Sequence, residues 1–582
     1  MRRIAALHVV ALPVLVTACS SNGTDIGTSS SGPASETIAE TSEALSPVAV
    51  NPNLTPIDAN TKGAGIASPN SLSPELIETV AAQGSNRLEN AATVTAADGT
   101  VLPVTYYGYS GDGPMVPAAG DVQSATHNVE STKTEPDKNT YLVLTGQTGA
   151  DPAYDYGTHF VFQGHENAVR APNGEKAGYI TRINLDADNK HRVTLLAATD
   201  ANGTLIPPID GSTWDPFAQK LLFTIEAGTV GGVLQATLAL PSAVQNLYGI
   251  MGRGGFEGIQ NDPNGNVWIV EDSGGPTGAV NTHARQPNSF LYRFVPKNAA
   301  DLTLGGKMQA LQVVSRQTGL PIVFHAGQAD ADILSADIKD LHTYGLNFAT
   351  HWVTIHDTDV DGTASFDANA AAKAHSATPF KRPENGQFRP GTNFREFYFD
   401  ATGDTSALTE AGSTFGGFGA VFKLTQSSPA ATDGTLTLFF NCDVTHSGFD
   451  NVAFWDRNHV VFVEDAGDGL HTQRNALDSA YMFDVRADYS IASNVPLRIL
   501  GEGRDPSATI DSGFAGTPGF NNEGDNEITG IHISNGDPSF FGLLGASLPH
   551  MFHNGWRMFY TAQHGDNVTW EVLPGPRMPA DD

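Results

Sequence analysis

Cysteine is nearly absent from this chain of 582 residues, which contains only Cys19 and Cys442. Cys19 lies in an N-terminal segment for which we predict a separate role below. If that role is correct, Cys442 has no partner and no intramolecular disulfide forms. The folded chain must then be stabilised by its hydrophobic core and by bound ions rather than by cross-links.

Positive charge is also scarce, because 32 Lys and Arg residues stand against 63 Asp and Glu residues, giving a formal net charge of −31. Such a surface repels nucleic acids and binds phosphate poorly unless metal ions bridge the two. A solvated acidic exterior accounts for most of the excess. Acids at the ends of apolar strands are not explained in this way and are the candidates for function.

The sequence has no apolar run long enough to form a permanent membrane-spanning helix. Its best candidate, within residues 1–18, follows two arginines and is too short. It ends in Val16-Thr17-Ala18-Cys19-Ser20, which resembles a bacterial lipobox. We therefore predict a lipoprotein signal peptide and lipidation of Cys19, with an ordinary cleaved signal peptide as the alternative. Serine directly after the cysteine resembles lipoproteins of the outer membrane, so we expect anchoring in the cell envelope.

The next segment predicts a tether followed by one folded domain. Residues 19–73 are rich in Ser, Thr, Ala, Pro and Gly and almost free of aromatic residues, which is typical of a flexible, disordered linker. A short helix is predicted from Pro74 to Ala82. Residues 74–582 are predicted to form a single domain.

Long segments with the 3.6-residue period of a helix are scarce in that domain. Instead, short runs of β-branched and aromatic residues alternate with Gly, Asp, Asn and Pro, as at residues 221–225 and 436–440. This pattern predicts an all-β fold.

Two segments almost two hundred residues apart repeat each other without a gap. Gly255-Phe256-Glu257-Gly258-Ile259 leads to Glu271-Asp272, and Gly448-Phe449-Asp450-Asn451-Val452 leads to Glu464-Asp465. In both, the first acid precedes the next by 14 positions. A unit repeated at wide spacing predicts a β-propeller, for which we expect five or six blades, six favoured, with loop or helical insertions. Carboxylates at equivalent blade positions converge on the axis, where cations make the crowding tolerable.

Less regular copies of this unit occur elsewhere. They run from Asp210 to Glu226, from Pro383 to Asp400, and from Asp525 to Gln563-His564, the last with a long insert.

Together these motifs resemble the PhoX-type alkaline phosphatase family, exported β-propeller enzymes that depend on calcium and also use iron. The resemblance runs with gaps from about Pro207 to Asn567. Its segments are Met251-Gly252-Arg253 before Glu257, Arg382-Pro383-Glu384 with Asn385-Gly386, Asp450-Asn451 with Glu464-Asp465, residues 525–531, and Gln563-His564.

One position departs from the family pattern. The family motif Thr-Cys-Glu-Glu, whose thiolate ligates iron, aligns with Thr224-Ile225-Glu226-Ala227. Ile225 has no donor atom, so an iron–thiolate centre of that type cannot form there. Cys442 follows an apolar strand and reads as a packed thiol. We therefore predict calcium, with more than one ion, and doubt iron.

Calcium needs only oxygen ligands, and the acids at strand ends supply them. Glu257, Glu384 and Asp450 are the strongest predicted ligands, with structural turn roles as the alternative. The remaining predicted ligands are Glu226, Asp272, Asn451, Glu464, Asp465 and Glu527. The loop Asp357–Gly362 resembles the start of a calcium loop but lacks its final acid, and reads as a solvated loop or a weak peripheral site.

Two further residues are predicted to act on the substrate. Arg382 lies two positions before Glu384, so in a strand both point to one face, and Arg382 could clamp two phosphate oxygens. A salt bridge between the two is the alternative. His564 is predicted to contact substrate or donate a proton. Clustered metals would polarise the phosphoryl group and lower the pKa of bound water.

The prediction is therefore a monomeric, lipid-anchored metallohydrolase that cleaves small phosphate esters outside the cytoplasm and does not bind nucleic acid. Two alternatives remain open at this point. One is a calcium-propeller hydrolase of the lactonase or organophosphate type. The other is a non-catalytic surface lipoprotein in which calcium stabilises the propeller.

Overall fold

The structure, a computed structural model, describes residues 53–62, 69–109, 134–166, 169–170, 173–503, 527–563 and 567–578. The predicted signal peptide, Cys19, the start of the last repeat at Asp525 and the predicted catalytic His564 lie outside these ranges. Among the described residues, no helix is both long and apolar enough to cross a membrane.

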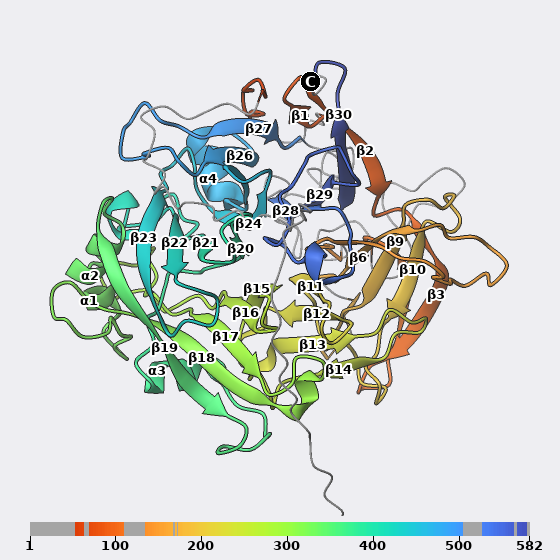
Figure 1. Cartoon of the computed structure of the whole chain (residues 1–582), viewed down its shortest axis with the longest axis horizontal. Helices are drawn as coiled ribbons and strands as arrows, with labels where there is room; N and C mark the ends of the chain where they lie inside the picture. Colours follow the sequence, from red (N-terminus) through yellow and green to blue (C-terminus); the bar gives the residue numbers. More distant parts are fainter. Residues whose placement is uncertain are drawn as a thin grey trace, which may run out of the picture. The chain divides into compact units, whose positions relative to one another are not determined.

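The all-β prediction is confirmed, because strands far outnumber helices in the described chain and form sheets, antiparallel except for the pair β10 and β3, that are arranged like the blades of a propeller (Figure 1). The first sheet in the chain has the order β4 (Val101–Tyr106), β3 (Arg87–Thr95), β10 (Val193–Ala197), β9 (Ile180–Asn184), β6 (His159–Gln163) and β5 (Thr140–Val143). The chain between β6 and β9 forms a small separate hairpin of β7 (Val169–Arg170) and β8 (Lys176–Ala177). The second sheet contains β11 (Ser212–Asp215), β12 (Lys220–Ile225), β13 (Gly232–Ala236) and β14 (Val244–Asn246).

The third sheet has nine strands and joins two antiparallel runs through β19 and β23. The first run is β15 (Phe256–Asn261), β16 (Val267–Glu271), β17 (Leu291–Pro296), β18 (Gly306–Val313) and β19 (Asn347–Asp357). The second run is β20 (Gly386–Phe388), β21 (Glu396–Ala401), β22 (Ala420–Gln426) and β23 (Asp433–Asn441). The blade count therefore depends on whether this sheet is divided between β19 and β23.

The last two sheets incorporate strands from the N-terminal part of the chain. One contains β24 (Phe449–Phe454), β25 (His459–Glu464), β26 (Ser479–Asp484), β27 (Leu497–Gly501) and β1 (Ser71–Leu72). The other contains β28 (Glu527–Ser534), β29 (Arg557–Gln563), β30 (Val568–Pro574) and β2 (Leu76–Ala82). The described helices are short insertions: α1 (Ala329–Ile333), α2 (Ala336–Leu341), α3 (Ala368–Ala374) and α4 (Gly467–Arg474).

Edge strands of five sheets form a closed inner ring, to which the nine-stranded sheet contributes both of its edge strands, β15 and β20. β5 contacts β11, β11 contacts β15, β15 contacts β20, β20 contacts β24, β24 contacts β28, and β28 contacts β5. In Figure 1, the labels of β11, β15, β20, β24 and β28 lie near the centre of the sheets. Residues at the start of each inner strand are therefore brought together, although they are far apart in sequence.

The predicted helix from Pro74 to Ala82 is wrong, because this segment forms strand β2. β2 pairs antiparallel with β30, from Leu76 opposite Pro574 to Ala82 opposite Thr569. A helix of about nine residues has little stability of its own, whereas pairing with β30 satisfies the backbone and buries Leu76 and Ala82. An N-terminal strand thus completes the sheet formed by the last strands of the chain.

The folded part also begins earlier than the predicted boundary at residue 74. Leu54 is buried in the core with residues of β25 to β30. Strand β1 pairs with β27, and the side-chain amide of Asn60 donates to the carbonyl oxygens of Gly501 and Glu502. The C-terminal part of the predicted tether therefore packs on the domain.

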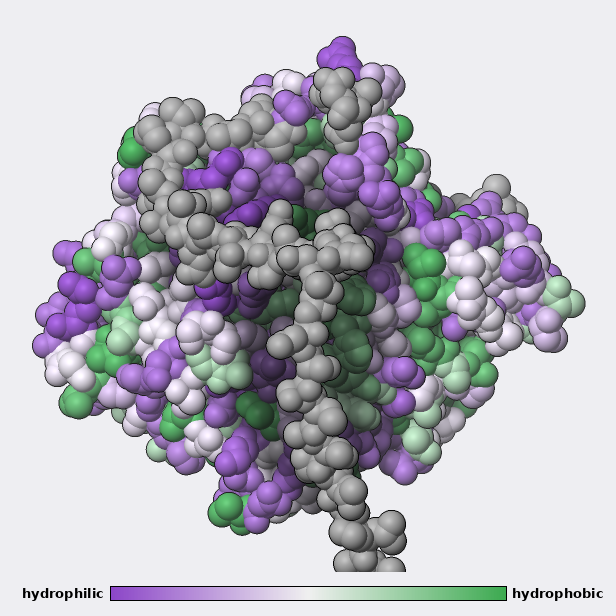
Figure 2. Space-filling view, viewed as in Figure 1, coloured by the Kyte–Doolittle hydropathy of each residue, from purple (hydrophilic) through white to green (hydrophobic). Residues whose placement is uncertain are grey.

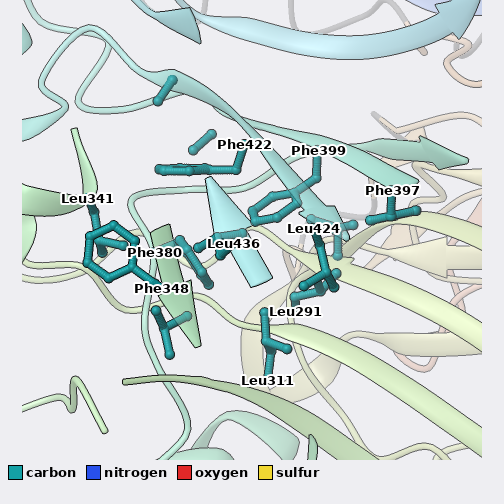
Figure 3. Close-up of a cluster of buried hydrophobic side chains, with 14 of the residues drawn as sticks. Leu291, Leu311, Leu341, Phe348, Phe380, Phe397, Phe399, Phe422, Leu424 and Leu436 are labelled. Carbon is teal, nitrogen blue, oxygen red and sulfur yellow. The ribbon is translucent and has the colours of Figure 1, made fainter. Parts of the chain in front are cut away.

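Hydrophobic residues fill the space between neighbouring sheets, and one of these clusters supports the Glu384 segment. Phe380, Phe397, Phe399 and Phe422 pack together, as Figure 3 shows, with Leu291 and Leu311 from the adjoining run of the same sheet. Burying a side chain of this size contributes about 1.5–3 kcal/mol. Outside the core, hydrophilic residues are spread over the face shown in Figure 2, between smaller hydrophobic patches.

Candidate metal centre

The two sequence repeats form equivalent structures, each with a β-bulge at its first acid. In β15, Phe256 lies opposite Glu271 and Ile259 opposite Ile269, which leaves one extra residue between them. In β24, Phe449 and Val452 lie opposite Glu464 and Phe462 with the same shift. Bulges change the direction of side chains and occur next to active sites. The equal spacing in sequence therefore reflects a repeated bulge that contains Glu257 or Asp450.

A glycine allows the next inner segment to approach Glu257. The amide of Gly258 donates to the carbonyl oxygen of Glu384 at 2.8 Å. A Cβ at this position would lie 2.8 Å from that oxygen and from the Cα of Asn385, which is too close for any other residue. The side-chain amide of Asn385 then donates to Glu257 Oε1 at 2.9 Å. Glu257 and Glu384 are thus held side by side.

The three strongest predicted ligands come together in the structure. Ligand oxygens of Glu257, Glu384 and Asp450 lie within 4.8 Å of one another, a separation that a single metal ion can bridge. All three side chains are buried, with exposed fractions of 3%, 5% and 6%. They come from the starts of three consecutive inner strands, as the propeller prediction requires.

A second cluster, of which the sequence singled out only Asp210, lies at the ends of β5, β6 and β11. Oxygens of Asp137, Glu166 and Asp210 also lie within 4.8 Å of one another. Asp137 precedes β5, Glu166 follows β6, and Asp210 precedes β11. An acid before one apolar strand and after the next is the same signal as in the repeats. The connection between β5 and β6 is longer than in the repeats, so the sequence spacing does not reveal this unit.

Further acids extend both clusters around the axis, and electrostatic interactions connect them. We call the full set the acidic ring. Its members are Asp137, Glu166, Asp210, Glu226, Glu257, Asp272, Glu384, Asp400, Asp450, Asp465 and Glu527.

The electrostatics of the ring favour the binding of cations. Burial, followed by neighbouring carboxylates, raises the pKa of Glu257, Glu384 and Glu527 well above the usual value. The same causes act on Asp137 and Asp210. Carboxylates so close together cannot all ionise unless positive charge is supplied.

Several ring oxygens are also available as ligands. Among the described residues, no hydrogen-bond donor reaches one oxygen each of Asp210, Glu257, Asp272 and Asp400, although all are buried. A buried oxygen without a donor is costly, and a bound cation removes the cost. Both clusters offer only carboxylate oxygens, which suit hard cations such as Ca²⁺.

Arg382 lies at the edge of this centre, paired mainly with Asp272. Its Nε and Nη2 each lie 2.8 Å from Asp272 Oδ2, and its Nη1 donates to Thr405 Oγ1. The predicted alternative, a salt bridge to Glu384, is present at a longer distance of 3.4 Å. Glu226, which follows β12, is exposed and interacts electrostatically with Asp272, Glu384 and Arg382. These predicted residues are therefore neighbours.

Two other predicted ligands have different surroundings. Both carboxylate oxygens of Glu464 bind Arg474, at 2.8 and 3.1 Å, and also accept the amides of Ser447 and Ser479. Asn451 accepts a hydrogen bond from Lys138 on its only side-chain oxygen and donates to Asp450. Glu464 therefore anchors a loop, and Asn451 orients Asp450, one of the predicted ligands. Arg474, the side-chain partner of Glu464, lies at the end of α4, and sequence spacing did not reveal this contact.

The same division holds in the other repeat. Glu271 accepts hydrogen bonds from the Phe290 amide, the Tyr292 hydroxyl and the Asn369 side chain. In each Glu-Asp pair, the glutamate is thus structural and the aspartate, Asp272 or Asp465, belongs to the acidic ring.

The Glu464 environment gives a prediction. Glu464→Gln should lower the stability of the protein by about 3 kcal/mol, because Arg474 is left in a buried site without its full counter-charge. Metal content should not change. Thermal unfolding and elemental analysis check both results, and a loss of metal with unchanged stability would show that Glu464 is a ligand.

The loop Asp357–Gly362 lies outside the acidic ring. Asp359 pairs with Lys297, Asp357 pairs with Lys307, and the Asp361 carboxylate accepts the Asp357 amide. These contacts fit a solvated surface loop.

A family model described as alkaline phosphatase PhoX matches residues 278–480, which include Arg382, Glu384 and Asp450. The predicted resemblance to the PhoX family is confirmed. The family match and the acidic clusters point to a phosphatase-type metallohydrolase.

The fold is supported by the solved structure of a PhoX protein. The structure of Pseudomonas fluorescens PhoX in complex with vanadate, a transition state analogue, is 11% identical, covers 90% of this chain and 98% of its own, and has a TM-score of 0.52. A Trichoderma reesei carbohydrate-active enzyme of family AA12 is 10% identical, covers 88% of this chain and 100% of its own, and has a TM-score of 0.29. No curated protein sequence matches the chain.

Proposed function

We propose that this chain is a calcium-dependent hydrolase of small phosphate monoesters, with the acidic ring as its metal centre. The proposal rests on one observation above all. Glu257, Glu384 and Asp450 lie within bridging distance of a single ion, and they stand beside a partly exposed arginine. A site with this much negative charge would repel a phosphate ester unless cations were bound.

Each group in the site has a separate role in this proposal. Ring carboxylates hold calcium, which when bound polarises phosphoryl oxygens and lowers the pKa of a coordinated water. Asn451 and Asn385 orient Asp450 and Glu257 through their side-chain amides. Arg382, with 21% of its side chain exposed, is the proposed cation that binds the phosphate. Asp272 holds it in place from one side.

Hydrolysis of an aryl phosphate by the purified chain, with calcium and with a chelator, tests this function. We expect activity with calcium and little without it. An aryl lactone assayed in parallel separates the alternatives. Cleavage of the lactone alone would identify a lactonase-type propeller, and calcium binding without hydrolysis of either compound would identify a binding lipoprotein.

The metal should be calcium without stoichiometric iron. Ile225 is fully buried in the core and offers no donor atom, and burial raises the pKa of the Cys442 thiol well above its usual value. A thiol in this state is a poor metal ligand. We expect Cys442→Ser to keep metal content and activity while losing about 1–3 kcal/mol of stability. Stoichiometric iron that disappears with activity in this variant would contradict the prediction.

We further propose export and lipid anchoring at Cys19, which lies outside the described residues. The support is the lipobox-like segment alone. Mass spectrometry of the N-terminal peptide from membranes tests it, and an unmodified cysteine at this position would overturn it.

A further inference from the structure

Lys138 is a cationic side chain that lies inside the acidic ring. It directly follows Asp137, precedes β5, and is 8% exposed. Its ammonium donates to Asn451 Oδ1 at 2.5 Å, so it reaches from the β5 segment to β24. The carboxylates of Asp450, Asp137, Asp400 and Glu257 all interact with it electrostatically.

This position is not explained by the packing of the fold. Burying an ammonium group is costly unless nearby negative charge compensates it. The nearest hydrogen-bond acceptor is a neutral amide, so the surrounding carboxylates must provide that compensation. The same carboxylates are those that need positive charge. The ammonium of Lys138 and the ring carboxylates therefore attract each other.

The amide of Asn451 couples the lysine to a ligand. Asn451 accepts from Lys138 through Oδ1 and donates from Nδ2 to Asp450 Oδ2 at 2.7 Å. Fixing the amide oxygen toward the ammonium turns its NH₂ group toward Asp450. The segment that precedes β5 thus sets the orientation of the Asp450 carboxylate in β24.

We propose that Lys138 supplies a fixed positive charge to the acidic ring and so limits how many divalent cations bind there. Through Asn451, it also orients the Asp450 carboxylate. This inference rests on the proposed metal centre. It assigns Lys138 as a positioning residue rather than a catalytic one.

The test measures calcium bound per chain and the calcium dependence of the melting temperature, using the full chain. Lys138→Met removes the charge at similar volume, Lys138→Arg keeps it, and Lys190→Met removes an exposed charge as a control. We expect Lys138→Met to bind about one more Ca²⁺ per chain, because the carboxylates lose a counter-charge. Its melting temperature in chelator should fall below that of Lys190→Met, whereas Lys138→Arg should resemble the wild type.

A second variant keeps the proposal testable if Lys138→Met does not fold. Asn451→Ala retains the ammonium but removes its link to Asp450, so calcium stoichiometry should be unchanged and affinity about 10–100-fold lower. Equal calcium content in Lys138→Met and wild type, or unchanged affinity in Asn451→Ala, would overturn the proposal alone. A wild type that binds no calcium would overturn the proposed metal centre as well.

Discussion

Neutral replacement of Glu257, Glu384 or Asp450 should lower phosphatase kcat/KM by at least about 100-fold, because loss of a group that merely orients a ligand already costs 10–100-fold. Glu257→Gln, Glu384→Gln and Asp450→Asn preserve side-chain volume and remove one negative charge each. Each should also lower the calcium content, since oxygens of the three residues lie within 4.8 Å of one another, close enough to bind one ion. Steady-state kinetics and elemental analysis measure both effects.

Two control variants separate loss of metal from loss of charge or of stability. Asp98→Asn changes an exposed acid on a turn, and should leave both measurements unchanged. Asp262→Asn changes a buried acid bonded to Asn266 and Trp268 away from the ring, and should lower stability with calcium content unchanged. If Asp262→Asn reduces calcium and activity as much as Glu257→Gln does, the three acids act only through the fold.

The repeated unit made much of the fold and part of the site predictable. The matching positions of Glu257 and Asp450 in two copies required equivalent strands, and the structure gives both the same bulge. Glu384 could be predicted because it also precedes a strand and lies in a motif shared with the PhoX family. These three residues depend on local pattern, which sequence shows directly.

What sequence did not show depends on contacts between distant segments. Asp137 and Glu166 are separated by a long connection, and they come together because β5 pairs with β6 and this pairing continues to the bridge between Pro136 and His165. The structural role of Glu464 requires Arg474 on α4. Likewise, β2 forms a strand because it pairs with the edge of β30, although its sequence has helical character.

The calcium-free protein should lose stability as the pH rises above about 4, where the acids of the ring ionise in the unfolded chain. Burial and neighbouring carboxylates raise the pKa of Glu257, Glu384, Asp210 and Glu527 in the folded state. In the unfolded chain these groups ionise near pH 4. Between the two pKa values the folded state holds more protons, so raising the pH favours unfolding.

Saturating calcium should remove this loss, because ionised carboxylates are then compensated by the bound ions. At a calcium concentration about 1,000 times Kd, binding adds about 4.1 kcal/mol. The difference between melting temperatures with calcium and with chelator should therefore increase with pH.

Part of the pH dependence should persist with calcium, since burial raises the pKa of Glu271, outside the ring, to about 8. Glu257→Gln removes one of the titrating groups and should reduce the pH dependence in chelator. A melting temperature in chelator that is constant or rises over this range would mean that the ring carboxylates ionise without metal, and that cations are not required to hold the propeller axis together.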